Sequence, residues 1–262
     1  MTLHPCPPLD QLGEEELRSR LDPTRLPRHL AVIMDGNRRW AKQRHLPVLM
    51  GHRAGVKAFR RVMETCRELG IQVLTAYAFS AENWRRSPAE VRVLMQLFEH
   101  YTRSERQKLQ RTGIRFRAVG RIDALPEGVR RELQATEEAT RNNSEMVLNL
   151  ALNYGGREEL TEACRKLARE VQSGRLSPEA IGEETLSGAL WTGGQPDPDL
   201  LIRTSGELRV SNFLLWQIAY TEFWFTELFW PDITRKVLLQ ALVEYQQRDR
   251  RYGGSTPGPQ GV

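Results

Sequence analysis

The sequence predicts an α/β fold, a single domain with a mostly parallel central sheet flanked by helices. Short runs of aliphatic and β-branched residues alternate with longer segments whose apolar residues recur at helical spacing, the pattern of βαβ units with right-handed crossovers. With 40% hydrophobic residues among 262, the chain can bury a sizeable core. Neither a repeat nor an internal linker divides it, so we expect one domain.

The first predicted strand is Leu30–Met34. A helix follows over Gly51–Leu69, where apolar residues share one face and a glycine ends the pattern, and a second strand over Ile71–Phe79. Ser87–Glu90 has the form of a capping box with proline at the first helical position. It starts a long helix that runs to about Gln110.

Further elements continue the alternation. Strands are predicted at Ile114–Val119, Met146–Leu152 and Leu200–Arg203, and helices at about Pro126–Asn142, Gly156–Gln172, Ser177–Leu190 and Ile233–Arg250. The two ends differ in composition from this body. Residues 1–28 are rich in proline and charge, with a short helix expected near Glu14–Arg20, and residues 255–262 belong to a Gly/Pro/Ser-rich tail. We therefore expect a partly disordered N-terminal extension, a folded domain over 29–254 and a disordered tail.

Composition narrows the class of ligand. Lys and Arg number 38 against 33 Asp and Glu, a net charge of +5 without the dense basic runs of a nucleic-acid binder. Phosphorylated small molecules fit better, and no nucleic-acid partner is expected. Cys6, Cys66 and Cys164 are too widely spaced for a disulfide framework or a zinc site, which favours a reducing cytoplasm. No apolar stretch approaches a bilayer span, although contact with a membrane surface stays open.

The first candidate site follows the first strand. Asp35 stands at the carboxyl end of a buried strand, where α/β sheets bind ligands, and Gly36 lets backbone N–H groups approach an anion. Arg38 and Arg39 add charge-assisted donors suited to phosphate. A divalent cation would reconcile the carboxylate with the phosphate, so we interpret Asp35 as a Mg²⁺ ligand. The alternative is an ordinary Asp-Gly turn with solvated arginines.

A second loop, after the second strand, belongs at the same edge of the sheet. Ser80, Asn83 and Arg86 offer hydroxyl, amide and guanidinium groups, and Phe79 and Trp84 offer apolar faces. This mixture suits a ligand with a charged head and an apolar body. The alternative is a loop that caps the core with its aromatic residues.

A third loop repeats the theme. The strand ending in Arg203 leads through a glycine turn to Arg209 and Ser211, which would hold a second diphosphate without a metal. Alternatively, these arginines pair with nearby acids, namely Asp197, Asp199 or Glu207.

The segment Phe213–Pro231 is strongly apolar, and acids within it need partners. Glu222 would either pair with an arginine in the core or complete the metal site with Asp35. The density of aromatic residues predicts a subunit interface or a lipid-facing wall.

Taken together, the motifs resemble those of the cis-prenyltransferases, the undecaprenyl diphosphate synthase family. They run in order from His29 to Gly254, at Met34–Ala41, Gly51–Gly55, Tyr77–Arg86, Asn153–Arg157, Ile202–Gln217 and Thr226–Asp232. The resemblance implies an undecaprenyl diphosphate synthase-like fold with a catalytic domain over residues 29–254. It also implies a homodimer that uses Mg²⁺ to condense isopentenyl diphosphate repeatedly onto an allylic diphosphate, usually farnesyl diphosphate.

Position by position, the resemblance implies roles for individual residues. Asp35 becomes the essential metal-binding acid, with Glu222 as the second metal-associated acid. The allylic diphosphate site comprises Gly36, Asn37, Arg38, Arg39, Trp40 and His52. The family's mobile loop corresponds to Ser80, Ala81, Glu82, Trp84 and Arg86, with Asn83 assisting proton removal. The isopentenyl diphosphate site comprises Arg203, Arg209, Val210 and Ser211.

One position departs from the family's pattern. Val48 stands where relatives often have an arginine, four residues before His52, which puts binding of the allylic substrate in doubt unless Arg38, Arg44 or Arg53 compensates. Two other classes of protein stay open. One is a catalytically silent, family-like scaffold subunit, and the other is a generic phosphate-ligand-binding α/β protein. The Gly-rich nucleotide loops that such a binder would carry are absent from the sequence.

Overall fold

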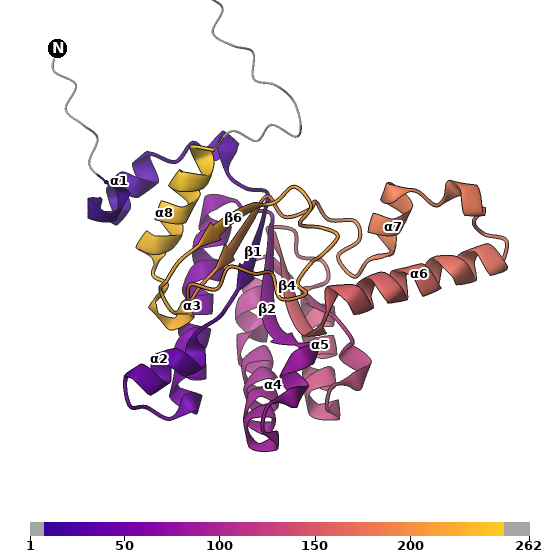
Figure 1. The fold of residues 1–262 in the computed structure, drawn as a ribbon, viewed down its shortest axis with the longest axis horizontal. Coiled ribbons are helices and arrows are strands. Elements are labelled where there is room, and N and C mark those ends of the chain that lie inside the picture. Colours follow the sequence, from indigo (N-terminus) through magenta and orange to yellow (C-terminus); the bar gives the residue numbers. More distant parts are fainter. Residues whose placement is uncertain (1–7, 249–262) are drawn as a thin grey trace, which may run out of the picture.

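A six-stranded sheet forms the centre of the computed structural model, which describes residues 8–248 (Figure 1). The strand order is β3-β4-β2-β1-β5-β6, and every strand pairing is parallel. The strands are β1 (His29–Ile33), β2 (Val73–Ser80), β3 (Ile114–Val119), β4 (Met146–Tyr154), β5 (Leu200–Arg203) and β6 (Glu222–Phe225). The predicted α/β class with a parallel central sheet is therefore confirmed.

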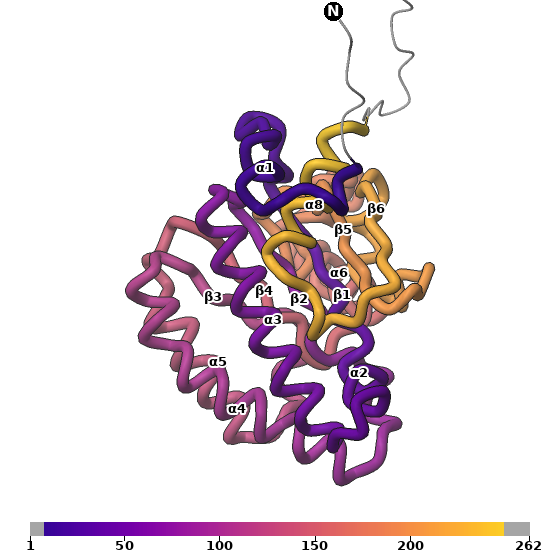
Figure 2. Tube along the Cα trace, turned by 90° about the vertical axis from the view of Figure 1, so that its left-hand side faces the viewer, coloured from indigo at the N-terminus to yellow at the C-terminus, as the bar shows by residue number. Residues whose placement is uncertain are grey.

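Two apolar layers cover the sheet, because successive residues of each strand point to opposite faces. The helices are α1 (Glu14–Ser19), α2 (Asn37–Gln43), α3 (Val48–Leu69), α4 (Pro88–Arg111), α5 (Glu127–Thr140), α6 (Gly156–Gln172), α7 (Glu183–Ala189) and α8 (Arg235–Gln246). Leu30 and Val32 of β1 pack in the larger core with α3, α4, α5 and α8, and Figure 2 shows α3, α4 and α5 together on that side. Ala31 and Ile33 face the smaller core, which includes Phe213.

Several predicted elements match the structure residue by residue. Ile114–Val119, Leu200–Arg203 and Gly156–Gln172 have the predicted bounds. The N-cap half of the predicted capping box is confirmed, since Ser87 Oγ accepts the backbone N–H of Glu90 at 3.3 Å and proline opens α4, whereas the Glu90 carboxylate accepts from Arg86.

Two elements were not predicted, namely helix α2 after Gly36 and strand β6 within the aromatic segment. One predicted helix differs from the structure. The single helix expected over Ser177–Leu190 is divided into a 3₁₀ turn (Pro178–Ala180) and α7, because the residues between them are extended.

The N-terminal extension is ordered as far as the structure describes it. Leu17 of α1 and Leu12, just before α1, are buried against Leu239 and Val243 of α8. Residues 1–7, the tail over 255–262 and the predicted end of the last helix lie outside the described residues.

The aromatic segment is mostly core, so only part of it is left for the predicted subunit interface or lipid-facing wall. Phe213, Leu214 and Ile218 are buried on one side of the sheet, and Trp224 and Trp230 on the other. Only parts of it, such as Tyr220 and Leu228, are exposed. Between residues 8 and 248, no helix combines the length and the apolar character needed to cross a bilayer.

Candidate active site

The three predicted loops meet at the carboxyl edge of the sheet. β2, β1 and β5 are neighbours, so Ser80, Asp35 and Arg203, which end or follow these strands, come together. They line one cavity of about 360 Å³. The other predicted site residues that line it are Gly36, Asn37, Arg38, Arg39, His52, Asn83, Arg86 and Ser211.

Asp35 lies between two arginines. Its Oδ1 accepts from Arg39 Nη2 at 3.1 Å and its Oδ2 from Arg203 Nη2 at 3.0 Å, and the backbone N–H of Gly36 adds a bond of 2.7 Å. Burial alone would raise the pKa of Asp35, but the hydrogen bond from Arg203 and the positive charges of both arginines outweigh it and hold this pKa below its usual value. Asp35 is therefore ionised at neutral pH.

Arg203 is the fixed centre of this network. Its side chain is only 3% exposed, and Nη1 donates to Ser211 Oγ at 2.8 Å and to the carbonyl of Arg209. Its Nε has no hydrogen-bond partner among the described residues. Arg203 thus connects the predicted isopentenyl diphosphate loop with Asp35 directly.

Gly36 allows two loops to touch. Its φ is +96°, and a Cβ there would collide with Ser205 Oγ and lie 2.7 Å from Phe229. The backbone after Asp35 can therefore approach the loop after β5 only because residue 36 is glycine.

Glu90 organises the basic side chains at the mouth of the cavity. Arg86 Nη1 donates to Glu90 Oε1 at 3.0 Å, and His52 Nε2 and Arg38 Nη1 each lie 3.9 Å from a Glu90 oxygen. Burial, aided by the charge of Arg86 and opposed by Glu90, lowers the pKa of His52 to about 4, so His52 is neutral at neutral pH. This role of Glu90 was not predicted, because its place in the capping-box pattern already accounted for the residue.

Glu222 does not lie beside Asp35 in the single chain, and its predicted part in the metal site stays a prediction. Glu222 pairs in register with Leu200, the first residue of β5, whereas Asp35 lies beyond the last rungs of the neighbouring strands. Glu222 Oε2 instead accepts from Arg248 Nη1 at 2.9 Å. Glu222 therefore has an arginine partner, as the alternative expected, although Arg248 is partly exposed and does not lie in the core.

Other predicted residues also lie outside the cavity, as far as the described chain shows. Trp40 Nε1 donates to Asp232 at 2.7 Å with Arg44 stacked over its ring, and Trp84 Nε1 donates to Asn153 at 2.7 Å. Arg209 pairs with Glu207, one of its foreseen alternatives, and is 60% exposed. Ala81, Glu82 and Val210 belong to the flanking turns, where Glu82 accepts from Asn212 and Val210 packs on the smaller core.

Val48, the position that departs from the family's pattern, opens α3 and is half-exposed. It does not line the cavity, and neither does Arg44, which is engaged with Asp232 at 3.2 Å, nor the exposed Arg53. Of the three arginines that were candidates to compensate for it, Arg38 is the one that reaches the cavity wall.

Asp35 is the one carboxylate among the residues that line the cavity, and the described chain holds no cluster of three or more metal-ligating side chains. This donor set suits Mg²⁺, which in phosphate sites takes one or two carboxylates and completes its shell with phosphate oxygens and water. Asp35 would hold the ion, and the arginines would hold the phosphates.

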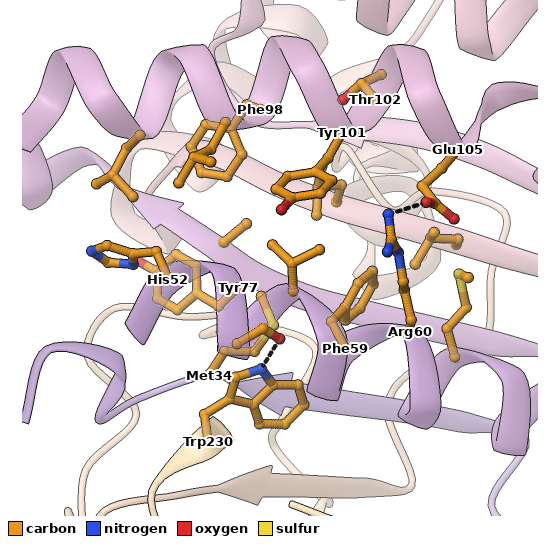
Figure 3. A pocket seen from close by; sticks show the side chains of 18 of the residues that line it. Met34, His52, Phe59, Arg60, Tyr77, Phe98, Tyr101, Thr102, Glu105 and Trp230 are labelled. Carbon is orange, nitrogen blue, oxygen red and sulfur yellow. Dashed lines mark hydrogen bonds and ion pairs between the residues drawn. The ribbon is translucent and has the colours of Figure 1, made fainter. Parts of the chain in front are cut away.

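An apolar cavity of about 150 Å³ adjoins the polar one (Figure 3). Both are lined by Met34, Asn37, His52, Tyr77, Ala78 and Leu94. From this shared wall the apolar cavity runs between α3 and α4, among side chains that include Phe59, Phe98, Tyr101 and Trp230. The site can therefore take a ligand with an anionic head and a long apolar tail.

Comparisons with known proteins agree with this geometry. The sequence profile of the undecaprenyl diphosphate synthase family matches residues 33–253. An isoprenyl transferase of Heliobacterium mobile is 54% identical over 92% of this chain and 93% of its own, and one of Shouchella clausii is 48% identical over 92% and 94%.

Solved structures agree as well. The lavandulyl diphosphate synthase of Lavandula x intermedia, in complex with dimethylallyl diphosphate, superposes with a TM-score of 0.84 at 41% identity, covering 88% of this chain and 99% of its own. A probable undecaprenyl diphosphate synthase of Campylobacter jejuni gives a TM-score of 0.72 at 33% identity, covering 87% and 98%. The fold, the joined cavities and these likenesses together show that the chain is a prenyltransferase and belongs to the undecaprenyl diphosphate synthase family.

Proposed function

We propose that this chain is a Mg²⁺-dependent cis-prenyltransferase, with residues 29–254 as its catalytic domain. It condenses isopentenyl diphosphate onto an allylic diphosphate starter, farnesyl diphosphate, to make a cis-polyprenyl diphosphate such as undecaprenyl diphosphate. The observation that carries the proposal is the continuity of the arginine-rich cavity with the apolar one. An elongating transferase needs both, because its intermediate keeps a diphosphate head while its tail grows.

The allylic half of the site centres on Asp35. Arg38 and Arg39 supply donors for the starter's diphosphate beside it, and the backbone freedom of Gly36 keeps that wall close to the diphosphate. The lavandulyl relative is in complex with dimethylallyl diphosphate, an allylic diphosphate, which supports this class of substrate. Mg²⁺, when held by Asp35, would neutralise negative charge on the departing diphosphate.

The second half centres on Arg203 and Ser211, which would bind isopentenyl diphosphate, with Arg86 and the exposed Arg209 as further cations within the adjoining loops. Asn83, whose Oδ1 accepts from the Ser80 N–H at 3.3 Å, stands on the cavity wall between the halves and would assist removal of the proton. The aromatic and aliphatic lining excludes water from the carbocation-like allylic centre.

A silent scaffold subunit is the competing function, and the intact set of lining groups disfavours it. The decisive experiment incubates the purified protein with labelled isopentenyl diphosphate and starters of different lengths, with and without a chelator. We expect labelled polyprenyl diphosphate that disappears when Mg²⁺ is removed. Binding of both substrates without any product would favour the scaffold, and binding of unrelated phosphates alone would favour a generic phosphate binder.

Membership of the family also leads us to infer a homodimer in the cytoplasm. A product with a long apolar tail favours peripheral contact with a membrane at release.

A further inference from the structure

An ion pair interrupts the wall of the apolar cavity. Arg60 of α3 and Glu105 of α4 form this pair, and both line the cavity among mostly aliphatic and aromatic side chains (Figure 3). The Arg60 guanidinium also lies over the ring of Tyr101, 5.3 Å from its centroid. The pair therefore joins the two helices that enclose the cavity.

The pair leaves polar atoms unsatisfied. Arg60 Nε and Glu105 Oε2 are buried, and neither has a hydrogen-bond partner among the described residues. A hydrocarbon tail that packs against this pair offers neither group a hydrogen bond, and it covers polar rather than apolar wall. A tail gains less free energy here than it gains against the purely apolar wall.

The pair lies deep in the cavity but not at its end. Arg60 is two helical turns, about 12 Å, beyond His52 on α3, and Figure 3 shows the pair and His52 at opposite ends of the labelled side chains. The lining continues past the pair, because Met63 and Leu109, each about one turn further along α3 and α4, also line the cavity. Space for a longer tail exists beyond the pair.

We propose that the Arg60–Glu105 pair sets product length by stopping the growing tail at this depth. The inference rests on the proposed function, since it concerns the tail of the elongated product. Each condensation pushes the tail further along the cavity until its end reaches the pair. There the next advance gains little, and the product dissociates instead of entering another cycle.

An apolar double variant, Arg60→Met with Glu105→Leu, tests the proposal because it removes both charges while keeping similar bulk. We expect its products, measured by mass spectrometry, to be longer by at least one isoprene unit. Products of unchanged or shorter length would overturn the proposal.

The chain supplies a matched control one turn further along the same helices. Glu64 of α3 pairs with Lys108 of α4, but neither is among the described residues that line the cavity. The double variant Glu64→Leu with Lys108→Met removes an equivalent helix-to-helix pair and should keep the wild-type product length. If this control lengthens the product equally, looser packing of the helices is the cause and the proposal fails.

A second variant separates polarity from volume. Arg60→Gln with Glu105→Gln removes the charges but keeps groups that need hydrogen bonds, so it should retain wild-type product length. Lengthening here would also overturn the proposal.

If the apolar variant does not fold, the kinetics of the wild-type protein with starters of different lengths test the proposal. kcat/KM for starters of increasing length should fall about tenfold at one tail length, a difference of about 1.4 kcal/mol, and a gradual decline would contradict the proposal. Absence of any condensation would instead refute the proposed function.

Discussion

Asp35 is the residue on which the chemistry depends most. Asp35→Asn keeps the size of the side chain but loses the charge that would hold Mg²⁺, so we expect kcat to fall at least ~10²–10³-fold, as when a major electrostatic contribution is lost. Asparagine is preferable to alanine, because its amide oxygen can still accept a hydrogen bond from the buried Arg203, whereas alanine removes the acceptor as well as the charge. Steady-state kinetics with a thermal unfolding control measure the effect. Near-normal turnover would show that Asp35 holds no metal.

Arg203 and Arg209 differ in whether their replacement would affect isopentenyl diphosphate binding alone. Arg203 contacts both Ser211 and Asp35, so its replacement should disturb both halves of the site. Arg209 is exposed and pairs only with Glu207 among the described side chains, so Arg209→Gln should raise the KM for isopentenyl diphosphate about tenfold and leave the starter's KM unchanged. Arg53→Gln, at an exposed position outside the cavity, is the control. Equal effects of Arg209→Gln on both substrates would argue against separate sites.

His29 should make stability depend on pH. It is buried at the start of β1, where its Nδ1 lies 2.7 Å from the Pro196 carbonyl and its Nε2 2.7 Å from Thr75 Oγ1. Burial lowers its pKa from 6.5 to about 4. Between these values the unfolded chain binds a proton that the folded chain does not, so the free energy of unfolding falls as pH falls.

Between pH 6.5 and 4.5 this contribution should amount to about 2–3 kcal/mol. Urea unfolding of the wild type and of His29→Gln measures it, since the variant should lose less stability over this range; the exposed His100→Gln serves as control. Parallel curves for wild type and His29→Gln would show that His29 is not held neutral.

At the scale of elements, the packing of α2 on α3 brings the arginines to the site. A Cβ on Gly51 would collide with the Asn37 carbonyl, a backbone atom that cannot move without the helix. We expect Gly51→Ala to destabilise the fold by about 1–3 kcal/mol through overpacking and to lower kcat/KM, because α2 carries Arg38 and Arg39. Gly188→Ala in α7 meets no neighbour within 4 Å and should be neutral or slightly stabilising in the same denaturation assay. Equal stability of the two variants would contradict close packing at Gly51.

Elements whose apolar periodicity and capping residues lie within one segment were predicted well from the sequence. Elements that depend on contacts with distant segments were predicted poorly. α4 was predicted because its capping box and its apolar face are readable in the chain. α2 was missed because Asn37–Gln43 has almost no apolar face, and β6 because its four residues are recognisable only by their pairing with β5.

The site follows the same rule. Asp35, Ser80 and Arg203 were expected together because ends of adjacent parallel strands meet, whereas the two alternatives for Glu222 stayed open because the sequence does not reveal which end of β6 it occupies. Register between distant strands is a property of the folded chain, not of either segment.

At the scale of the whole molecule, the edge strand β6 is the surface that we expect to pair with a second copy. Most large side chains of the aromatic segment are buried within one chain, but Tyr220 is 71% exposed beside β6, and Phe223 and Phe225 stack half-buried along the strand with ring centroids 5.8 Å apart. An apolar edge strand without a neighbour in the described chain favours association.

We therefore expect the protein to be a dimer at micromolar concentration by light scattering, and Tyr220→Glu to weaken it. A carboxylate placed in an apolar contact must be desolvated there, and thermal unfolding of the variant checks that the fold of the single chain is kept. Ile181→Glu, a similar change at a 42% exposed apolar residue in the segment before α7, should leave the dimer intact. A fully active wild-type monomer would refute the dimer. Dissociation by Ile181→Glu but not by Tyr220→Glu would place the contact away from β6.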